Sequence, residues 1–167
     1  MHKNTNIEMN NVPEIQIRFS SSTDSFFIRD LSAKAFKPFG EYGEVVLKWH
    51  LSGNSITVIA CHEDRSLGFA MVSKPFSRYD QDNSSELLAI AIETDWQGKG
   101  IGKLILREIE KVAFKSGITT VFLHTAVENR NARKLFSDSG YRIWQIKKKF
   151  YPEGQDACVM AKKITSV

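Results

Sequence analysis

Residues 95–102, DWQGKGIG, have the composition and spacing of a loop that binds an anion. The glycines at 98, 100 and 102 let backbone amides approach a ligand closely, because no side chain stands in the way. An apolar run from Leu87 to Ile92 precedes the loop, and helical spacing of apolar residues begins at Ile101. The N-terminus of a helix carries partial positive charge and unpaired N–H groups, so the loop predicts a binding site for a phosphate group.

The spacing of this loop decides among the known phosphate-binding patterns. A dinucleotide fingerprint requires a third glycine where Lys103 stands. A nucleotide-binding P-loop requires a glycine at Gln97 and a hydroxyl residue at Leu104, and neither is present. The pattern that remains is Q-x-x-G-x-G, formed by Gln97, Gly100 and Gly102. The sequence therefore excludes a Rossmann site and ATP hydrolysis.

Two further motifs follow the loop in the order and spacing of a known family. One is N-x-x-A-x-x-L-[YF]-x-x-x-G-[FY], matched by Asn129, Ala132, Leu135, Phe136, Gly140 and Tyr141, and the other is FYPEGQDACVM at residues 150–160. With these motifs and the loop, the chain resembles the GNAT superfamily of N-acetyltransferases over about Ile15 to Ile164. The last motif is similar to the closing hairpin of the ribosomal-protein N-terminal alanine acetyltransferases.

The resemblance implies that acetyl-CoA is the acyl donor and that an amine attacks its thioester directly in a ternary complex. The acceptor would be a protein N-terminus, a lysine or a small amine, and the sequence does not choose among them. Amides near Ala91 and Ile92 would polarise the thioester carbonyl. The residues expected to bind the cofactor are Leu88, Ala89, Ile90, Ala91, Ile92, Gln97, Gly98, Lys99, Gly100, Ile101, Gly102, Lys103, Asn129, Ala132, Lys134 and Phe136.

Two residues occupy family positions for the general base that removes a proton from the amine. Glu86, at the start of the strand before the loop, is the first choice, and His124, five residues before Asn129, is the second. Each has a structural alternative, because a glutamate at a strand end is commonly solvated and a histidine in an apolar strand is often a hydrogen-bonded core residue.

The sequence departs from the family at Phe136, where many members have a tyrosine that protonates the departing coenzyme A sulfur. Phenylalanine has no proton to give. Tyr151 is the replacement that we nominate, and its alternative role is to line the acceptor pocket. The absence of that tyrosine is also compatible with an alternative function, a catalytically silent domain that binds acyl-CoA and regulates another process.

Several residues near the expected site have two possible roles. Arg130, Arg133 and Lys134 are candidates for the 3′-phosphate of coenzyme A, or they form a solvated helix face. The run 147–149, KKK, is expected to be a solvated strand end. The early segment also contains the aromatic residues Phe36, Phe39, Tyr42 and Trp49, which either line the acceptor cleft or pack on the sheet, and packing is the expectation for most of them.

Periodicity and turn residues predict the element order β-α-α-β-β-β-α-β-α-β-β, a mixed α/β domain around one sheet. The resemblance specifies a mixed, mostly antiparallel sheet of seven strands with about four helices. Helices are expected to end near Phe36, Leu51, Gly117 and Gly140, and residues 78–85 are expected to form a loop. The expected strands are 14–19, 55–62, 66–76, 86–92, 118–126, 141–151 and 156–164.

Composition limits the remaining possibilities. A chain of 167 residues with 42% hydrophobic residues suits one domain, expected at 14–167 after a flexible leader at 1–13. The net charge of +4 is too small and dispersed to indicate a nucleic-acid partner. Cys61 and Cys158 are expected to be buried thiols, and no metal spacing is present. We expect a cytoplasmic monomer or homodimer without a membrane segment.

Overall fold

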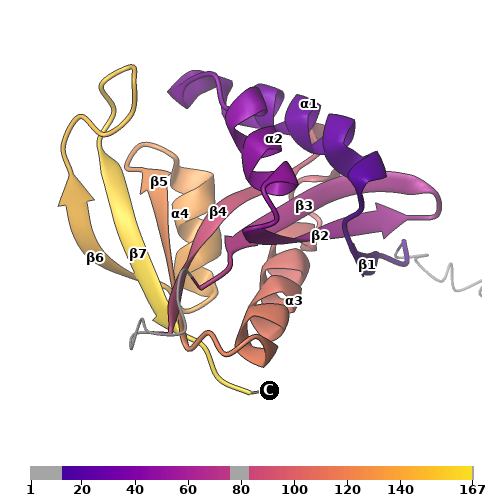
Figure 1. Ribbon diagram of the computed structural model, residues 1–167. Coiled ribbons are helices and arrows are strands. Elements are labelled where there is room, and N and C mark those ends of the chain that lie inside the picture. The colour runs from indigo at the N-terminus through magenta and orange to yellow at the C-terminus, as the bar shows by residue number, and fades with distance from the viewer. Residues whose placement is uncertain (1–12, 76–82, 167) are drawn as a thin grey trace, which may run out of the picture.

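A single mixed sheet of seven strands forms the centre of the molecule (Figure 1). The computed structural model describes residues 13–75 and 83–166. The strand order is β1-β2-β3-β4-β5-β7-β6, and each neighbouring pair is antiparallel except the parallel pair β4 and β5. The strands are β1 Gln16–Phe19, β2 Ser55–His62, β3 Arg65–Ser73, β4 Ser84–Ile92, β5 Thr120–Ala126, β6 Arg142–Lys147 and β7 Ala157–Lys163.

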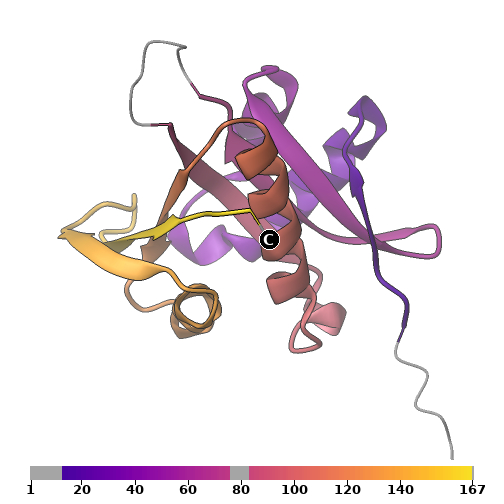
Figure 2. The same ribbon diagram turned by 90° about the horizontal axis from the view of Figure 1, so that it is seen from below.

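Helices cover both faces of the sheet. Helices α1 Ser25–Ala35 and α2 Gly43–Leu51 lie on one face, whereas α3 Ile101–Lys115 crosses the opposite face (Figure 2). Helix α4 Arg130–Asp138 follows β5 and contributes Phe136 to the core under α3. Short 3₁₀ helices precede α1, follow it at Lys37–Phe39 and precede the glycine loop at Thr94–Trp96.

Each face of the sheet has its own apolar core because side chains of a strand alternate between the two sides. The α3 face buries Ile105, Ile109 and Leu123, among others, and the α1–α2 face buries Ile28, Val46 and others. The spacing of apolar residues in α3 predicted this division, since those residues recur at helical intervals on one side only. Cys61 and Cys158 are buried free thiols, as expected.

The predicted order of helices and strands is confirmed, with two local differences. Residues Ser84 and Ser85 belong to β4, although they were expected in a loop, because they pair with Thr120 and Val121 of β5. The other part of that expected loop, residues 78–82, and almost all of the expected leader lie outside the described residues. Strand β6 ends at Lys147, earlier than expected, and a positive φ of 48° at Lys149 turns the chain.

The parallel strands β4 and β5 diverge halfway along their length. Their pairing joins residues 84–87 to residues 120–123 and then stops, while both strands continue. On its other side β4 has a bulge, since Leu87 pairs with Val72 and Ala89 with Met71, which leaves Leu88 as the extra residue. The divergence leaves backbone groups of β4 facing an open space between the two strands.

In the part of the chain that the structure describes, no helix is both long and apolar enough to cross a lipid bilayer.

Candidate active site

The glycine loop forms an open cradle at the N-terminus of α3. Gly98 and Gly100 have φ values of 73° and 82°, which glycine adopts without strain. A Cβ atom at either position would have nothing within 4 Å, so these glycines leave space that side chains would occupy. Within the described residues, no side-chain hydrogen bond caps α3, and its first N–H groups remain available for an anion.

The predicted cofactor residues converge on a cleft where β4 and β5 diverge. Those that line the cleft are Ile90, Ala91, Ile92, Gln97, Gly98, Gly100, Gly102, Lys103, Asn129, Ala132, Lys134 and Phe136. Leu88 and Ala89 line the neighbouring aromatic cavity instead. Ile101 is buried in the core under α3, and the Lys99 amine lies over the Trp96 ring at 4.8 Å.

The backbone of β4 presents alternate residues to this cleft. The Glu93 N–H donates to the Leu67 carbonyl of β3 at 2.7 Å, so the Ala91 N–H, two residues earlier, also faces β3. Ile90 and Ile92 therefore direct their N–H groups toward the open edge. The Gln97 amide donates to the Ile92 carbonyl at 3.0 Å and fixes the loop against the end of the strand. Of the expected amide pair, the Ile92 N–H is the one that faces the cleft.

Helix α4 borders the cleft with polar and basic residues. Asn129 caps the helix by accepting a hydrogen bond from the Ala132 N–H at 3.2 Å. Arg133 donates to the Val127 carbonyl at 2.8 Å, and Arg130 is exposed. Lys134 lines the cleft and bonds Asp138 of the same helix at 2.8 Å. Among the three basic residues of α4, Lys134 is thus the one that the cleft includes.

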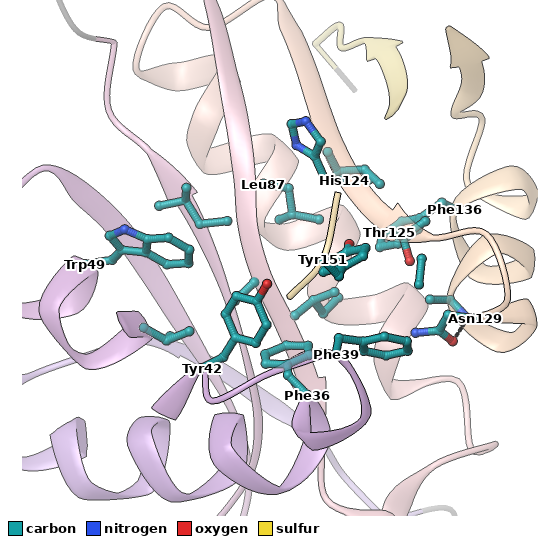
Figure 3. Close-up of a pocket in the computed structure, with 17 residues that line it drawn as sticks. Phe36, Phe39, Tyr42, Trp49, Leu87, His124, Thr125, Asn129, Phe136 and Tyr151 are labelled. Carbon is teal, nitrogen blue, oxygen red and sulfur yellow. Dashed lines mark hydrogen bonds between the residues drawn. The ribbon is translucent and has the colours of Figure 1, made fainter. Parts of the chain in front are cut away.

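A second, aromatic cavity adjoins the cleft on the α1–α2 face (Figure 3). Phe36, Ile90, Asn129, Ala132 and Phe136 line both spaces, so the two meet at these residues. All four early aromatic residues line this cavity, and three of them, Phe36, Tyr42 and Trp49, also pack against the core of the α1–α2 face, as expected for most of them. They come from the segment between α1 and α2 and from α2 itself.

The two candidate bases are joined in one hydrogen-bonded pair. His124 Nδ1 lies 2.8 Å from Glu86 Oε1 across the paired ends of β4 and β5. His124 lines the aromatic cavity, whereas Glu86 faces a neighbouring pocket that it shares with Ser73 and Ser85. Their side chains are 15% and 33% exposed, so the pair lies between the interior and solvent.

Two residues of the closing hairpin complete the surroundings of His124. The Phe150 ring stacks on the imidazole with centroids 4.7 Å apart and planes 5° from parallel. The Lys147 amine lies 3.1 Å from His124 Nε2. The expectation of a solvated strand end is therefore wrong for Lys147, although Lys148 is exposed and bonds Asp156. An ammonium can only donate, so the network assigns the imidazole proton to Nδ1, which donates to Glu86.

Tyr151 and Tyr42 bring phenol groups to the aromatic cavity (Figure 3). Burial raises the pKa of both phenols above the ordinary value, and for Tyr151 a nearby Glu86 charge raises the pKa further. Both groups therefore remain protonated at neutral pH and can act as hydrogen-bond donors. Phe136 is 3% exposed and packs edge-on against Tyr141, whose hydroxyl donates to Glu110 at 2.9 Å.

Comparison with known proteins agrees with this fold. A profile of the acetyltransferase (GNAT) family matches residues 24–141, and the chain belongs to that family. The bS18-alanine N-acetyltransferase of Salmonella typhimurium is 27% identical over 137 residues, which cover 80% of this chain and 81% of the relative. The uncharacterized N-acetyltransferase MJ1530 of Methanocaldococcus jannaschii is 26% identical over 148 residues, covering 88% and 90% of the two chains.

A solved structure extends the comparison to the whole fold. The structure of yncA from Salmonella typhimurium, solved with its cofactor acetyl-CoA, has a TM-score of 0.77, an identity of 15% and coverage of 92% and 95% of the two chains. The protein is thus an acetyl-CoA-dependent N-acetyltransferase with a GNAT fold, as the family profile and the relatives support. The described residues contain no group of three potential metal ligands.

Proposed function

We propose that the protein transfers the acetyl group of acetyl-CoA directly to a primary amine held in the aromatic cavity, and that His124 and Glu86 act together as the general base. The observation that carries this proposal is the hydrogen-bonded pair at the wall of a cavity that adjoins the cofactor cleft. Geometry favours His124 as the group that meets the amine, because His124 lines the cavity and Glu86 lies behind it.

The residues of the cleft fit an acyl-coenzyme A. Acetyl-CoA supplies an acetyl group activated as a thioester. The open glycines at 98 and 100 and the uncapped first turn of α3 suit a diphosphate. Lys103 adds positive charge at the same cleft, where Lys134 is paired with Asp138. The Ile90 and Ile92 N–H groups are the edge donors for an amide-containing arm, and the Ile92 N–H is our candidate for a preorganised donor to a carbonyl oxygen.

The base pair can take a proton without leaving an isolated charge. When the Lys147 amine moves off Nε2 and His124 accepts a proton there, the resulting imidazolium donates to the Glu86 carboxylate through Nδ1, and the two opposite charges stabilise one another. An amine acceptor arrives largely protonated at neutral pH, more so for a lysine than for an α-amino group, so this help matters most for lysine. Tyr151, which stays protonated, is the available donor near Phe136.

The acceptor cavity favours an amine attached to an apolar or aromatic group. Its walls include four early aromatic residues, Tyr151 and aliphatic residues of β4. Apart from the phenols of Tyr42 and Tyr151, His124 is the titratable residue that lines it. A polyamine would require carboxylates for its additional charges. The similarity to a bS18-alanine N-acetyltransferase makes a peptide N-terminus the first acceptor class to test.

The test measures release of free coenzyme A thiol from acetyl-CoA in the presence of N-terminal peptides, lysine peptides and small amines. We expect His124→Gln to lower kcat/KM at neutral pH by about 10²- to 10⁴-fold and Glu86→Gln by about 10-fold or more, with the residual rate rising at higher pH. Glu93→Gln is the control, because Glu93 follows the other end of β4 and pairs with Lys34 of α1 instead of His124.

Each outcome has a defined meaning. A larger loss in Glu86→Gln than in His124→Gln would make Glu86 the direct base. Near-normal rates in both variants would refute a base role for the pair. Binding of acetyl-CoA without thiol release for any amine would favour the silent regulatory domain, which the phenylalanine at Phe136 also suits.

A further inference from the structure

Lys147 differs from other hydrogen-bonded lysines of the structure in the kind of group that it contacts. Five lysine amines, those of Lys34, Lys111, Lys134, Lys148 and Lys162, bond carboxylates. The Lys147 amine instead lies 3.1 Å from Nε2 of His124, the atom that our proposed function uses to accept a proton. A carboxylate keeps an ammonium protonated, whereas a general base can deprotonate it.

The Lys147 amine occupies the place that an acceptor amine would take on His124. Lys147 ends the edge strand β6 and pairs with Ala157 of β7, so its side chain must cross β7 to reach His124 on β5. The amine also lies 5.6 Å from the centre of the Phe150 ring, which stacks on the same imidazole. A primary amine is therefore already held on the candidate base by the chain itself.

The three groups share their protons in a way that can produce a free amine. In the resting arrangement Lys147 donates to Nε2, and Nδ1–H donates to the Glu86 carboxylate. Moving one proton from the lysine to Nε2 gives a neutral amine next to an imidazolium, and Glu86 stabilises that imidazolium. The net charge of the group does not change, so the transfer brings no additional charge into a site that is only partly exposed.

We infer that Lys147 is an acceptor of the enzyme's own acetyl transfer, a conclusion that rests on the proposed function. The Lys147 nitrogen attacks the thioester carbonyl carbon of acetyl-CoA, a new C–N bond forms and the C–S bond breaks. One proton of the ammonium goes to His124, which later releases it to water, and the second proton that the nitrogen loses goes to the departing coenzyme A thiolate, directly or by relay through the Tyr151 hydroxyl. The products are Nε-acetyl-Lys147 and coenzyme A, and acetyl-CoA is the sole co-reactant.

The reach of the side chain is compatible with this reaction. His124 lines the aromatic cavity, which meets the cofactor cleft at Ile90 and Asn129. Lys147 thus begins one hydrogen bond away from the wall of the space where the acetyl group and the amine are proposed to meet. A lysine has a flexible four-carbon stem, and rotation of that stem moves the amine by several ångströms without moving the strand.

The experiment incubates the purified protein with acetyl-CoA and no added amine and follows acetylation of each lysine by peptide mass spectrometry. Lys148 is the internal control, because it is the neighbouring lysine, its side chain is 80% exposed and it bonds Asp156. Uncatalysed acetylation would favour the exposed lysine. We expect Lys147 to be acetylated at least about 10-fold faster than Lys148, and His124→Gln to reduce its rate to that of Lys148.

Two further measurements keep the inference testable if His124→Gln is poorly folded. Glu86→Gln should also slow modification of Lys147 and leave Lys148 unchanged. In the protein without acetyl-CoA, ¹⁵N NMR of the imidazole should show the proton of His124 on Nδ1, and Lys147→Met should shift the Nε2 resonance. Protonation of neutral His124 on Nε2 would overturn the inference, because that tautomer cannot accept from the lysine.

The outcomes separate this inference from the proposed function. Thiol release with an added amine, together with a Lys147 rate equal to that of Lys148, would overturn the inference and leave the function intact. Modification of Lys147 that persists at full rate in folded His124→Gln would also overturn it. Absence of both thiol release and lysine modification would refute the function and the inference together.

Discussion

A pair of glycine substitutions tests whether the loop at 97–102 binds the cofactor. Gly100 is the N-cap residue of α3 and Gly117 follows its other end, with φ values of 82° and 92°. At both positions a Cβ atom would have nothing within 4 Å. Gly100→Ala and Gly117→Ala therefore introduce the same kind of backbone strain on one helix, but Gly100 alone of the two lines the cleft.

The strain should lower the stability of both variants to a similar extent. An L-residue in the left-handed region costs roughly 1–2 kcal/mol. For a protein of this size, 1 kcal/mol corresponds to a change in Tm of roughly 2–4 °C. We expect both variants to melt about 2–8 °C below the parent protein when no ligand is present.

Acetyl-CoA should then distinguish the two variants. At a ligand concentration of about 100 times Kd, binding stabilises a protein by about 2.7 kcal/mol, or roughly 5–10 °C. A methyl group at Gly100 occupies the open space next to the loop amides, and loss of one hydrogen bond to a charged group weakens binding by about 10- to 150-fold. A 100-fold loss leaves about 0.4 kcal/mol of stabilisation, which is roughly 1–2 °C.

Thermal denaturation with and without acetyl-CoA measures both effects in one assay. Gly117→Ala should keep the full ligand-induced shift, and Gly100→Ala should lose most of it. Equal shifts in the two variants would refute the assignment of the loop as the diphosphate site. A much larger loss of stability in Gly100→Ala without ligand would show that the loop has a structural role beyond this site.

Three further predictions concern the missing general acid at Phe136, the ion pair of Asp24 with Arg18, and the close approach of Gly68 to β4. Phe136→Tyr should raise kcat about 2- to 10-fold with unchanged acetyl-CoA affinity. The reason is that a tyrosine would place a proton donor where the aromatic cavity meets the cofactor cleft. A fall in kcat of more than about 10-fold would refute this prediction. Asp24, 5% exposed, is bonded twice by Arg18 at 2.8 Å, which holds its carboxyl pKa below the usual range. Asp24→Asn should cost about 1–3 kcal/mol in urea unfolding at pH 7, and the deficit should shrink as the pH falls below about 4 toward the lower folded-state pKa; a deficit that persists at pH 2 would refute it. Gly68→Ala should lower the free energy of unfolding by about 1–3 kcal/mol, because its Cβ would lie 2.7 Å from the Ala91 carbonyl oxygen; an unchanged urea midpoint would refute this.

The features that the sequence predicted are those that local chemistry determines. Helix α3 ends just before Gly117, as expected, and its apolar residues face the core. Each of these features depends on residues within about one or two turns of chain, so periodicity and residue type were sufficient.

The features that the sequence did not predict depend on contacts across the sheet. Lys147 reaches His124 although 23 positions separate them, because β7 lies between β6 and β5 in space. The early aromatic residues both line the cavity and pack on the sheet, and the sequence left these two roles open because the choice depends on how the segment between α1 and α2 lies against β4. A run of three lysines has the same local pattern whether one of them bonds an imidazole or all of them face water.

The parallel pairing of β4 and β5 explains why the helix N-termini that favour an anion lie next to the Glu86–His124 pair. A parallel connection requires a crossover, and here α3 provides it, so the C-terminal ends of both strands and the N-termini of α3 and α4 lie at the same edge. Both helix starts, at Gly100 and Asn129, line the cleft and favour an anion there. Where the strands are still paired, Glu86 and His124 lie side by side on the opposite face from α3 and favour a protonated amine. The divergence of the strands joins these two environments, because it opens the sheet between the proposed anion site and the proposed base. An acetyl group held between β4 and β5 would then be accessible to an amine from the α1–α2 face.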